Sequence, residues 1–317
     1  MTASPELLQR LHPELAERVR RIEAAGGKPG HLQTPAEVRA AFLAARQPLQ
    51  RSATGLAIAD RQLERKDGPP IPLRTYVPQA AAPLAALAFF HGGGFTNGDL
   101  DSHDALACAL ALESGCAVVA VDYRVLPDHP FPAAFDDAVA VLRWLPAWCD
   151  ELGLARERIA AGGDSSGANL AMAAALQLRS TLRLRALWLA YPIIGGDFET
   201  PSYIENAEAP LLTRARCQRI LEDYLGRPPT SADWRVTPLL HPDVEKLPPV
   251  VAIAAELDPL RSDAEILVER LGPGSGSVLV EGGGMPHGFL RWIEDSVACQ
   301  AVASTSFAAL RRLLAAN

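Results

Sequence analysis

The chain has 317 residues, of which 49% are hydrophobic and 21% charged, and its formal net charge at pH 7 is −7. These values are typical of a folded protein with a large core, and a negative chain without a long basic run gives no basis for nucleic-acid binding. The five cysteines are odd in number and scattered, a distribution that suits reduced thiols better than a disulfide framework or zinc-type spacing.

The first fifty residues have the pattern of helices. One helical stretch over residues 5–27 ends on two glycines, and a second begins with Thr34 at the N-cap, Pro35 at the first helical position and Glu37 two residues later. Charges run through residues 1–21, which therefore lack the apolar core of a signal peptide, and the longest apolar stretch is about half a membrane span. We expect a cytoplasmic protein that does not insert into a membrane.

Strands and helices alternate along the rest of the chain. Two stretches of alternating polarity, near 54–62 and 70–77, predict strands at an antiparallel edge of a sheet. Apolar strands are predicted at 84–90, 116–123, 158–164, 184–192, 248–256 and 276–282, and helices at 101–114, 134–149, 168–180 and 260–271. Strands that are apolar on both faces and alternate with helices predict an α/β protein with a mostly parallel central sheet flanked by helices.

A proline-rich interval of about fifty residues interrupts this alternation at 197–246. An insertion of that length in a compact domain is normally functional. We predict that residues 1–50 and 197–246 together form a helical cap, and that 51–196 and 247–317 form the two parts of a catalytic domain.

The sequence IAAGGDSSGANLAMAAAL (159–176) places Ser165 between Gly163 and Gly167, after a predicted strand and before a predicted helix. This is the context of the Gly-x-Ser-x-Gly nucleophile elbow, a turn so sharp that larger side chains beside the serine would collide. The amino terminus of the following helix stabilises negative charge. Ser165 is therefore the candidate nucleophile.

A serine nucleophile needs a base, and the base needs a carboxylate. In this architecture both follow the serine in sequence, which leaves His241 and His287 of the seven histidines. His287 follows the last predicted strand in a glycine-rich stretch, whereas His241 lies in the proline-rich insertion, where a surface or loop role is expected. We choose His287 as the base.

The candidate carboxylates follow the strand near 248–256 and are Glu256, Asp258 and Asp263. Pro259 favours an extended Asp258 at the carboxyl end of that strand, although a role as a helix N-cap is an alternative. Asp263 falls one turn into the helix and is expected to face solvent, and strand alternation directs Glu256 away. We choose Asp258.

The stretch HGGGF (91–95) directly follows a predicted strand, and its three glycines can direct backbone N–H groups at one point. The amide of Ser166, next to the nucleophile, is a further donor for a developing oxyanion. A phosphate-binding loop is the alternative, but the stretch lacks the lysine and the spacing of such loops.

These motifs resemble the hormone-sensitive-lipase family of α/β-hydrolase esterases, the bacterial family IV carboxylesterases. The resemblance covers residues 70–310 through HGGGF, DYRVLPDHPFPAAFDDA, GGDSSGANLA, ELDPLRSDAE and HGF, in that order. It departs from the family in YRVLPDHP, where Tyr-Arg-Leu-Ala-Pro-Glu-His-Pro is usual, and at Ser166, where alanine is commoner.

The resemblance implies an α/β-hydrolase fold with a helical cap. It implies that Ser165, Asp258 and His287 form the catalytic triad, and that the oxyanion amides are those of Gly93, Gly94 and Ser166. His91 and Gly92 would support the glycine loop.

The expected function is hydrolysis of short- to medium-chain acyl esters by a serine carboxylesterase without a cofactor or metal. An amidase or acyltransferase with the same triad stays open, while a non-catalytic ligand receptor on this fold is disfavoured because His287 is present. The expected partner is a small-molecule ester, and a homodimer is possible. Four aromatic residues are candidates to line the substrate pocket: Phe95, Phe198, Tyr203 and Trp234.

Overall fold

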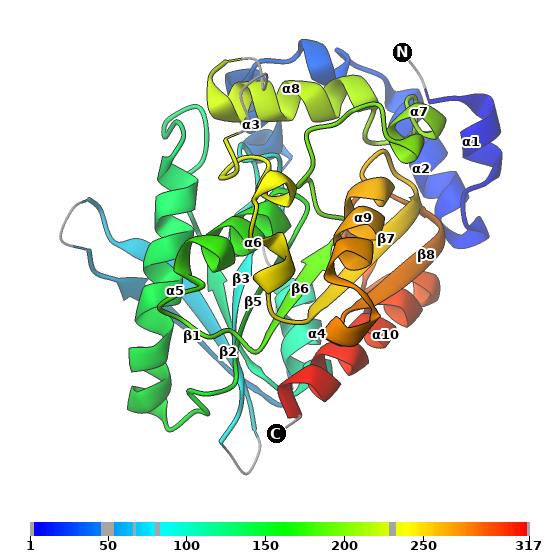
Figure 1. Ribbon diagram of the computed structural model, residues 1–317. Coiled ribbons are helices and arrows are strands. Elements are labelled where there is room, and N and C mark those ends of the chain that lie inside the picture. Colours follow the sequence, from blue (N-terminus) through cyan, green and yellow to red (C-terminus); the bar gives the residue numbers. More distant parts are fainter. Residues whose placement is uncertain (1–2, 46–53, 66–67, 80–82, 228–232, 316–317) are drawn as a thin grey trace.

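The computed structural model describes residues 3–45, 54–65, 68–79, 83–227 and 233–315, and a single eight-stranded sheet crosses its centre (Figure 1). The strands are β1 (Leu56–Leu63), β2 (Ile71–Pro78), β3 (Ala86–Phe90), β4 (Ala117–Val121), β5 (Ile159–Asp164), β6 (Ala186–Ala190), β7 (Val250–Leu257) and β8 (Val278–Pro286). Their order is β1-β2-β4-β3-β5-β6-β7-β8. The pairs β1–β2 and β2–β4 are antiparallel and all later pairs are parallel, which confirms the predicted mostly parallel sheet with an antiparallel edge.

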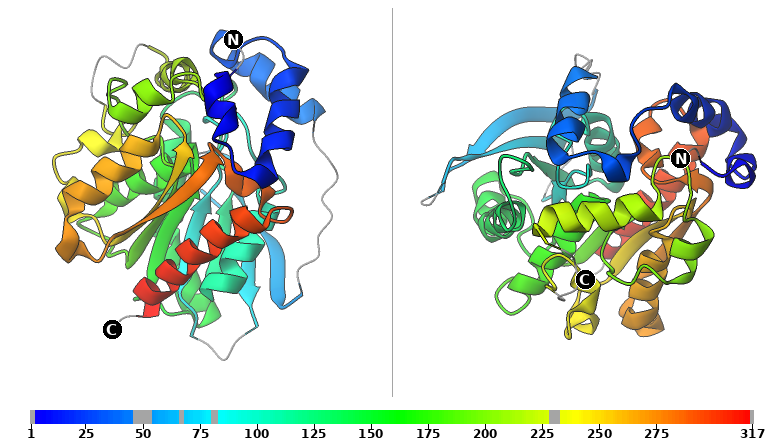
Figure 2. Two further views of the ribbon diagram at one scale, coloured as in Figure 1. Left: turned by 90° about the vertical axis from the view of Figure 1, so that its right-hand side faces the viewer. Right: turned by 90° about the horizontal axis from the view of Figure 1, so that it is seen from above.

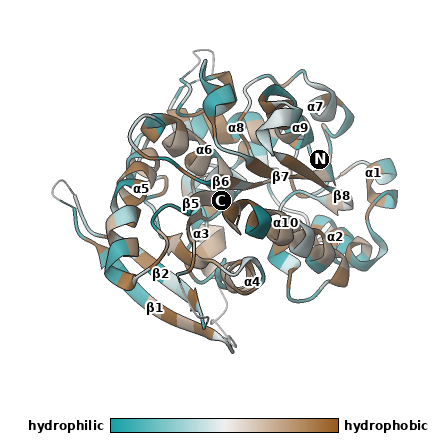
Figure 3. Ribbon diagram, turned by 60° about the horizontal axis from the view of Figure 1, so that its bottom comes forward, coloured by the Kyte–Doolittle hydropathy of each residue, from teal (hydrophilic) through white to brown (hydrophobic). Residues whose placement is uncertain are grey.

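Helices cover both faces of this sheet. The helices α5 (Ala133–Leu152), α6 (Ser166–Leu178) and α9 (Arg261–Leu271) lie on one face, and α4 (Asp104–Ser114) and α10 (Val297–Ala315) lie on the other. Each face of the sheet has its own core. Along β3 the side chains of Ala88 and Phe90 join the core under α5, α6 and α9, and those of Leu87 and Phe89 join the core under α4 and α10, because successive strand residues point to opposite faces. Both faces being buried explains why the strands are apolar throughout, as β7 shows in Figure 3.

A group of short helices lies above one end of the sheet (Figures 1 and 2). From the amino-terminal segment they are α1 (Pro5–Gln9), α2 (Pro13–Ala25), η1 (Gly30–Leu32) and α3 (Pro35–Ala44), and from the insertion α7 (Pro201–Glu205) and α8 (Arg214–Leu225). The insertion continues with η2 (Pro238–Leu240) and η3 (Val244–Lys246), and two further turns are η4 (Pro273–Ser275) and η5 (Phe289–Trp292). Thr34 caps α3 in a capping box with Glu37, as its sequence predicts.

Hydrogen bonds join the amino-terminal segment to the insertion. The Arg216 Nη1 atom on α8 donates to the carbonyl oxygen of Gly30 at 3.0 Å, and the Leu211 amide donates to the Glu23 carboxylate at 2.9 Å. The two segments therefore contact each other directly. The division of the chain into cap and catalytic domain stays a prediction. Residues 46–50 and 228–232 of the predicted cap lie outside the described residues.

The helices α1 and α2 also contact the β7–β8 edge of the sheet. The His12 amide donates to the Gly284 carbonyl oxygen at 2.9 Å, and Arg10 pairs with Glu256 at 2.8 Å. Within the described part of the chain, no helix combines the length and apolarity needed to cross a membrane. All five cysteines are free thiols.

Candidate active site

Ser165 stands at the turn between β5 and α6 with a φ of 53° and a ψ of −116°. A positive φ is unfavourable for any residue with a Cβ atom and costs on the order of 1–3 kcal/mol. The turn is held by the Ser165 amide, which donates to the Ala190 carbonyl oxygen at 2.8 Å. A Cβ atom at Gly163 or Gly167 would overlap the carbonyl oxygen of Phe90, so both flanking positions require glycine. The sharp turn predicted around this serine is present.

Three of the predicted side chains meet at the carboxyl ends of β5, β7 and β8. The Ser165 Oγ atom lies 3.0 Å from His287 Nε2, and His287 Nδ1 lies 2.7 Å from Asp258 Oδ2. The other Asp258 oxygen accepts a hydrogen bond from the Leu260 amide at 2.9 Å. Asp258 is fully buried, and the two other side chains are nearly so. The geometry is that of a hydroxyl facing a base whose second nitrogen is fixed by a carboxylate.

The strand before His287 is longer than its sequence predicts. We expected a strand to 282 and then a glycine-rich loop, but β8 continues through Gly282–Gly284 to Pro286, with an irregular register opposite Ala255 and Leu257. His287 is therefore the first residue after a strand rather than a residue on a swinging loop. Its ring contacts Tyr191 edge-on, with ring centroids 5.0 Å apart.

The glycine loop after β3 turns sharply toward Ser165. Gly93 and Gly94 have φ values of 131° and 61°, and the Gly93 carbonyl oxygen accepts hydrogen bonds from the amides of Thr96 and Asn97. Within the described residues, the amides of Gly93 and Gly94 donate no hydrogen bond. Ser166 is the first residue of α6, so its N–H has no acceptor within the helix. Three backbone donors are thus left for an oxygen of a bound ligand.

His91 and Asp164 fix the base of this loop. The His91 Nδ1 atom lies 2.9 Å from the Gly92 carbonyl oxygen, and burial lowers the pKa of His91 to about 4, so the ring is neutral at pH 7. The Gly92 amide donates to Asp164 Oδ1 at 2.7 Å. Burial raises the pKa of Asp164, but His103 and the Gly92 amide outweigh burial, and the net direction is down. Asp164 therefore joins the serine turn to the glycine loop as a carboxylate.

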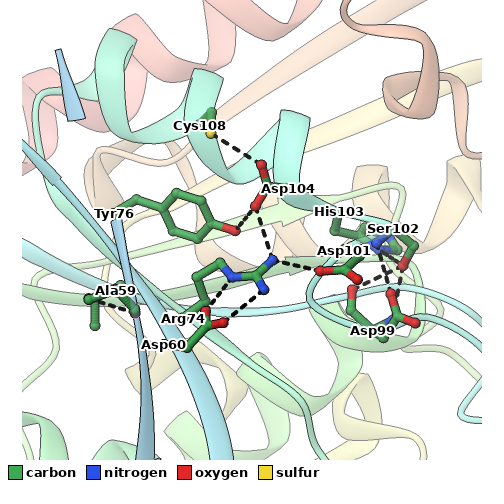
Figure 4. Close-up of polar contacts among 11 residues, drawn as sticks. Ala59, Asp60, Arg74, Tyr76, Asp99, Asp101, Ser102, His103, Asp104 and Cys108 are labelled. Atoms are coloured by element: carbon green, nitrogen blue, oxygen red, sulfur yellow. Dashed lines mark hydrogen bonds and ion pairs between the residues drawn. The ribbon is translucent and has the colours of Figure 1, made fainter. Parts of the chain in front are cut away.

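His103 completes this arrangement, with its Nε2 atom 3.4 Å from Asp164 Oδ1. The segment that carries His103 is tied to the sheet by Arg74 of β2, whose Nη1 atom lies 2.8 Å from Asp101 and 3.1 Å from Asp104 (Figure 4). Sequence reasoning missed Asp164 and His103. Asp164 could have been found because it stands inside the serine motif, whereas His103 was set aside because it precedes the serine.

A cavity of about 460 Å³ opens beside Ser165 and His287. The apolar part of its lining includes Val38 and Phe42 of α3, Leu211 and Leu212 before α8, Ile220 of α8, and Leu290.

None of the four predicted aromatic residues lines this cavity. Phe95 is buried and stacks on Tyr224 with ring centroids 3.7 Å apart, Phe198 packs edge-on against Tyr203, and Trp234 packs against Phe135. Phe95 and Tyr203 belong to the buried core, and Phe198 and Trp234 pack against it.

The alternative base and acids lie elsewhere. His241 is in the insertion loop, as expected, but it is buried against Trp234 and its Nδ1 atom accepts from the Asp243 amide. Glu256 faces Arg10 and the Gly284 amide. The expectation that Asp263 faces solvent is wrong, because only 1% of the residue is exposed.

Asp263 is buried because the first turn of α9 packs onto the segment that follows β6. One of its oxygens accepts hydrogen bonds from the amides of Ile194 and Gly195, at 2.9 and 2.6 Å. Burial raises the pKa of Asp263 to about 7.

Comparisons with known proteins give a consistent result. The model of the family described as the alpha/beta hydrolase fold matches residues 87–291. The carboxylesterase NlhH of Mycobacterium tuberculosis is 37% identical over 253 residues, which cover 77% of this chain and 79% of that protein. The ethyl acetate hydrolase of Pseudomonas putida is 34% identical over 295 residues, which cover 89% of this chain and 92% of that protein.

Solved structures agree with these sequence matches. The crystal structure of a thermostable esterase from Pseudomonas putida ECU1011 has a TM-score of 0.87 at 27% identity and covers 100% of both chains. A bacterial heroin esterase has a TM-score of 0.86 at 29% identity and covers 98% of this chain and 99% of its own.

Proposed function

This chain belongs to the α/β-hydrolase family and is a carboxylic ester hydrolase, and we propose that Ser165, His287 and Asp258 are its nucleophile, base and acid. The resemblance to the hormone-sensitive-lipase family is confirmed. The observation that carries the assignment of residues is the line of contacts from Ser165 Oγ through the two nitrogens of His287 to Asp258.

In the proposed reaction, Ser165 Oγ attacks the carbonyl carbon of the ester while His287 Nε2 takes the hydroxyl proton. Asp258 accepts a hydrogen bond from Nδ1, which leaves Nε2 without a proton in the resting state and stabilises the imidazolium once it forms. The tetrahedral intermediate then collapses, His287 returns the proton to the departing alcohol oxygen, and an acyl-serine remains. Water repeats the sequence with His287 as base and releases the acid.

The proposed oxyanion hole consists of the amides of Gly93, Gly94 and Ser166. In support, these donors have no competing acceptor in the described chain, so none has to break a hydrogen bond when the carbonyl oxygen becomes negative. His91 and Gly92 act as supporting residues in this proposal, because they hold the loop without reaching the reacting atoms.

The proposed substrates are esters with short to medium acyl chains. A cavity of about 460 Å³ lies in the lower part of the range of about 300–1,000 Å³ that ligand sites span, and each methylene buried against its apolar wall contributes about 0.8 kcal/mol only as far as that wall extends. Longer chains leave methylenes in water and gain nothing further.

The test of the assignment is Ser165→Ala, with hydrolysis of 4-nitrophenyl acetate as the readout. Removing a triad nucleophile lowers turnover by on the order of a million-fold in well-studied serine hydrolases. A fluorophosphonate should label the wild type at Ser165 and leave the variant unlabelled. Labelling at another residue, with Ser165 unmodified, would refute the proposal.

Two finer expectations also remain proposals. A homodimer is checked by light scattering of the purified protein, and a cytoplasmic location by fractionation of the cells that produce it.

A further inference from the structure

The wall of the active-site cavity carries two arginines that the proposed mechanism does not use, Arg216 on α8 and Arg291 after His287. Only 14% of the Arg216 side chain is exposed, although its ion pair with Asp223 is a long one of 3.9 Å. A charged group is retained in such a place when a partner compensates it.

The protein itself compensates Arg216 only in part. Its nearest carboxylate, on Asp223, lies 3.9 Å away, beyond hydrogen-bond distance, and accepts instead from Arg219 at 2.7 Å. The one hydrogen bond that the Arg216 guanidinium donates within the described chain goes to the Gly30 carbonyl oxygen. Burial lowers the pKa of Arg216, Asp223 opposes this, and Arg219 adds to it. A guanidinium has five N–H donors, so most of them are left for a ligand.

Arg216 is close to the reacting centre. Ile220, one helical turn further along α8, lies directly against Gly94, since a Cβ atom built on Gly94 would be 3.3 Å from its side chain. Residues four apart on a helix share one face, so Arg216 stands roughly 6 Å along the helix axis from Ile220, the residue that contacts the glycine loop.

Arg291 lines the cavity near the segment that carries His287 and Gly288. Its Nε atom donates to the Gly288 carbonyl oxygen at 2.8 Å, and its guanidinium occupies the space that a side chain on Gly288 would need. It is exposed and lines the same cavity as His287. Among the described lining residues the one carboxylate is Asp164, whose oxygens already accept from the Gly92 amide and the Tyr191 hydroxyl. Among these lining residues two guanidinium groups therefore stand against one carboxylate, and positive charge predominates.

We propose that the preferred esters carry a carboxylate, which binds to Arg216 while Arg291 attracts it at the cavity mouth. This inference rests on the proposed ester hydrolase function and adds the charge of the substrate to it. A carboxylate matches the planar guanidinium through two parallel hydrogen bonds, which a neutral group of the same shape cannot form.

The test compares two pairs of esters in which a carboxylate is replaced by a neutral carboxamide of similar shape. With the carboxylate on the alcohol side, the pair is 4-acetoxybenzoate and 4-acetoxybenzamide; with the carboxylate on the acyl side, it is monoethyl adipate and ethyl adipamate. In at least one pair the wild type should have a kcat/KM for the anionic ester about ten-fold above that for the neutral one, equivalent to about 1.4 kcal/mol. This ratio should fall as salt is added.

Arg216→Gln should lower the ratio about ten-fold. Arg216→Lys should keep part of it, because lysine retains the positive charge but lacks the two parallel N–H donors of the guanidinium. Arg214→Gln is the matched control: it removes the same charge from the same helix, but Arg214 pairs with Glu199 and does not line the cavity. Thermal unfolding of each variant reports whether the fold is intact.

Two outcomes would overturn the inference. One is a wild type that hydrolyses the neutral esters but prefers the anionic ester in neither pair, which leaves the proposed function standing. The other is an equal decrease of the ratio in Arg214→Gln and Arg216→Gln, which would indicate long-range electrostatic attraction by α8 rather than a carboxylate-binding site at Arg216. A wild type that hydrolyses none of the four esters would contradict the ester hydrolase function itself.

Discussion

The amide variant Asp258→Asn tests how the proposed base is prepared. In the wild type one oxygen of Asp258 accepts from the Leu260 amide and the other faces His287 Nδ1. An asparagine that keeps its oxygen toward Leu260 turns its NH₂ group toward His287, which then must accept at Nδ1 and carry its proton on Nε2. A protonated Nε2 cannot take the proton of Ser165.

The opposite orientation of the amide does not rescue this variant. It directs the NH₂ group at the Leu260 N–H and leaves two buried donors facing each other, at a cost of about 1–3 kcal/mol for each unpaired donor. Because Asp258 is fully buried, water cannot relieve that cost. The inactive tautomer should therefore dominate, and we expect kcat to fall about 10⁴-fold, equivalent to about 5 kcal/mol of transition-state stabilisation.

The assay is steady-state hydrolysis of 4-nitrophenyl acetate, with kcat and KM determined separately. KM should change little, because Asp258 does not line the cavity. Asp263→Asn is the control: it makes the same chemical change at another buried acid after β7, one that contacts the amides of Ile194 and Gly195 rather than His287. It should keep most of the activity. An Asp258→Asn enzyme within about ten-fold of the wild type, or an equal loss in Asp263→Asn, would refute the reasoning.

Three further predictions concern a buried acid, the glycines and the length of the acyl chain. Burial raises the pKa of Asp263 to about 7, so between about pH 4 and pH 7 the unfolded chain has lost this proton while the folded chain retains it, and folding stability decreases as pH rises. Asparagine does not ionise, so Asp263→Asn does not lose stability in this way. The difference in melting temperature between Asp263→Asn and the wild type should therefore increase, in favour of the variant, as pH rises across this range; a constant difference would contradict the raised pKa. Gly167→Ala should abolish soluble, active enzyme because its Cβ atom would overlap the Phe90 carbonyl oxygen, whereas Gly153→Ala, at a helix end with open space around it, should cost about 1 kcal/mol in chemical denaturation. Across an acyl-ester series kcat/KM should peak at short chains, with no jump in rate at the substrate's solubility limit; a jump when the emulsion forms would indicate a true lipase instead.

Local patterns were sufficient for the sheet and for the serine turn. The strand predicted at 158–164 is observed at Ile159–Asp164, because a strand buried on both faces has to be apolar along its whole length. Gly163 and Gly167 also have a local cause, a turn in which no Cβ atom fits.

Tertiary packing decided what the patterns could not. Asp263 follows Asp258 by five residues in a charged stretch, and nothing in that stretch reveals that the amides of Ile194 and Gly195 approach it. The cavity lining has the same origin: α3 and α8 are far apart in sequence, so the contribution of Phe42 or Arg216 depends on how the two segments pack.

The strained turn at Ser165 has a consequence for protein engineering. Its φ of 53° with ψ of −116° belongs to a region of backbone conformation that glycine alone occupies without penalty. A library screened only for heat resistance would therefore favour Ser165→Gly, which relieves the turn and removes the hydroxyl. Stability and turnover are in conflict at this one position, so selection for thermostable variants must keep Ser165 fixed or score hydrolysis in every round.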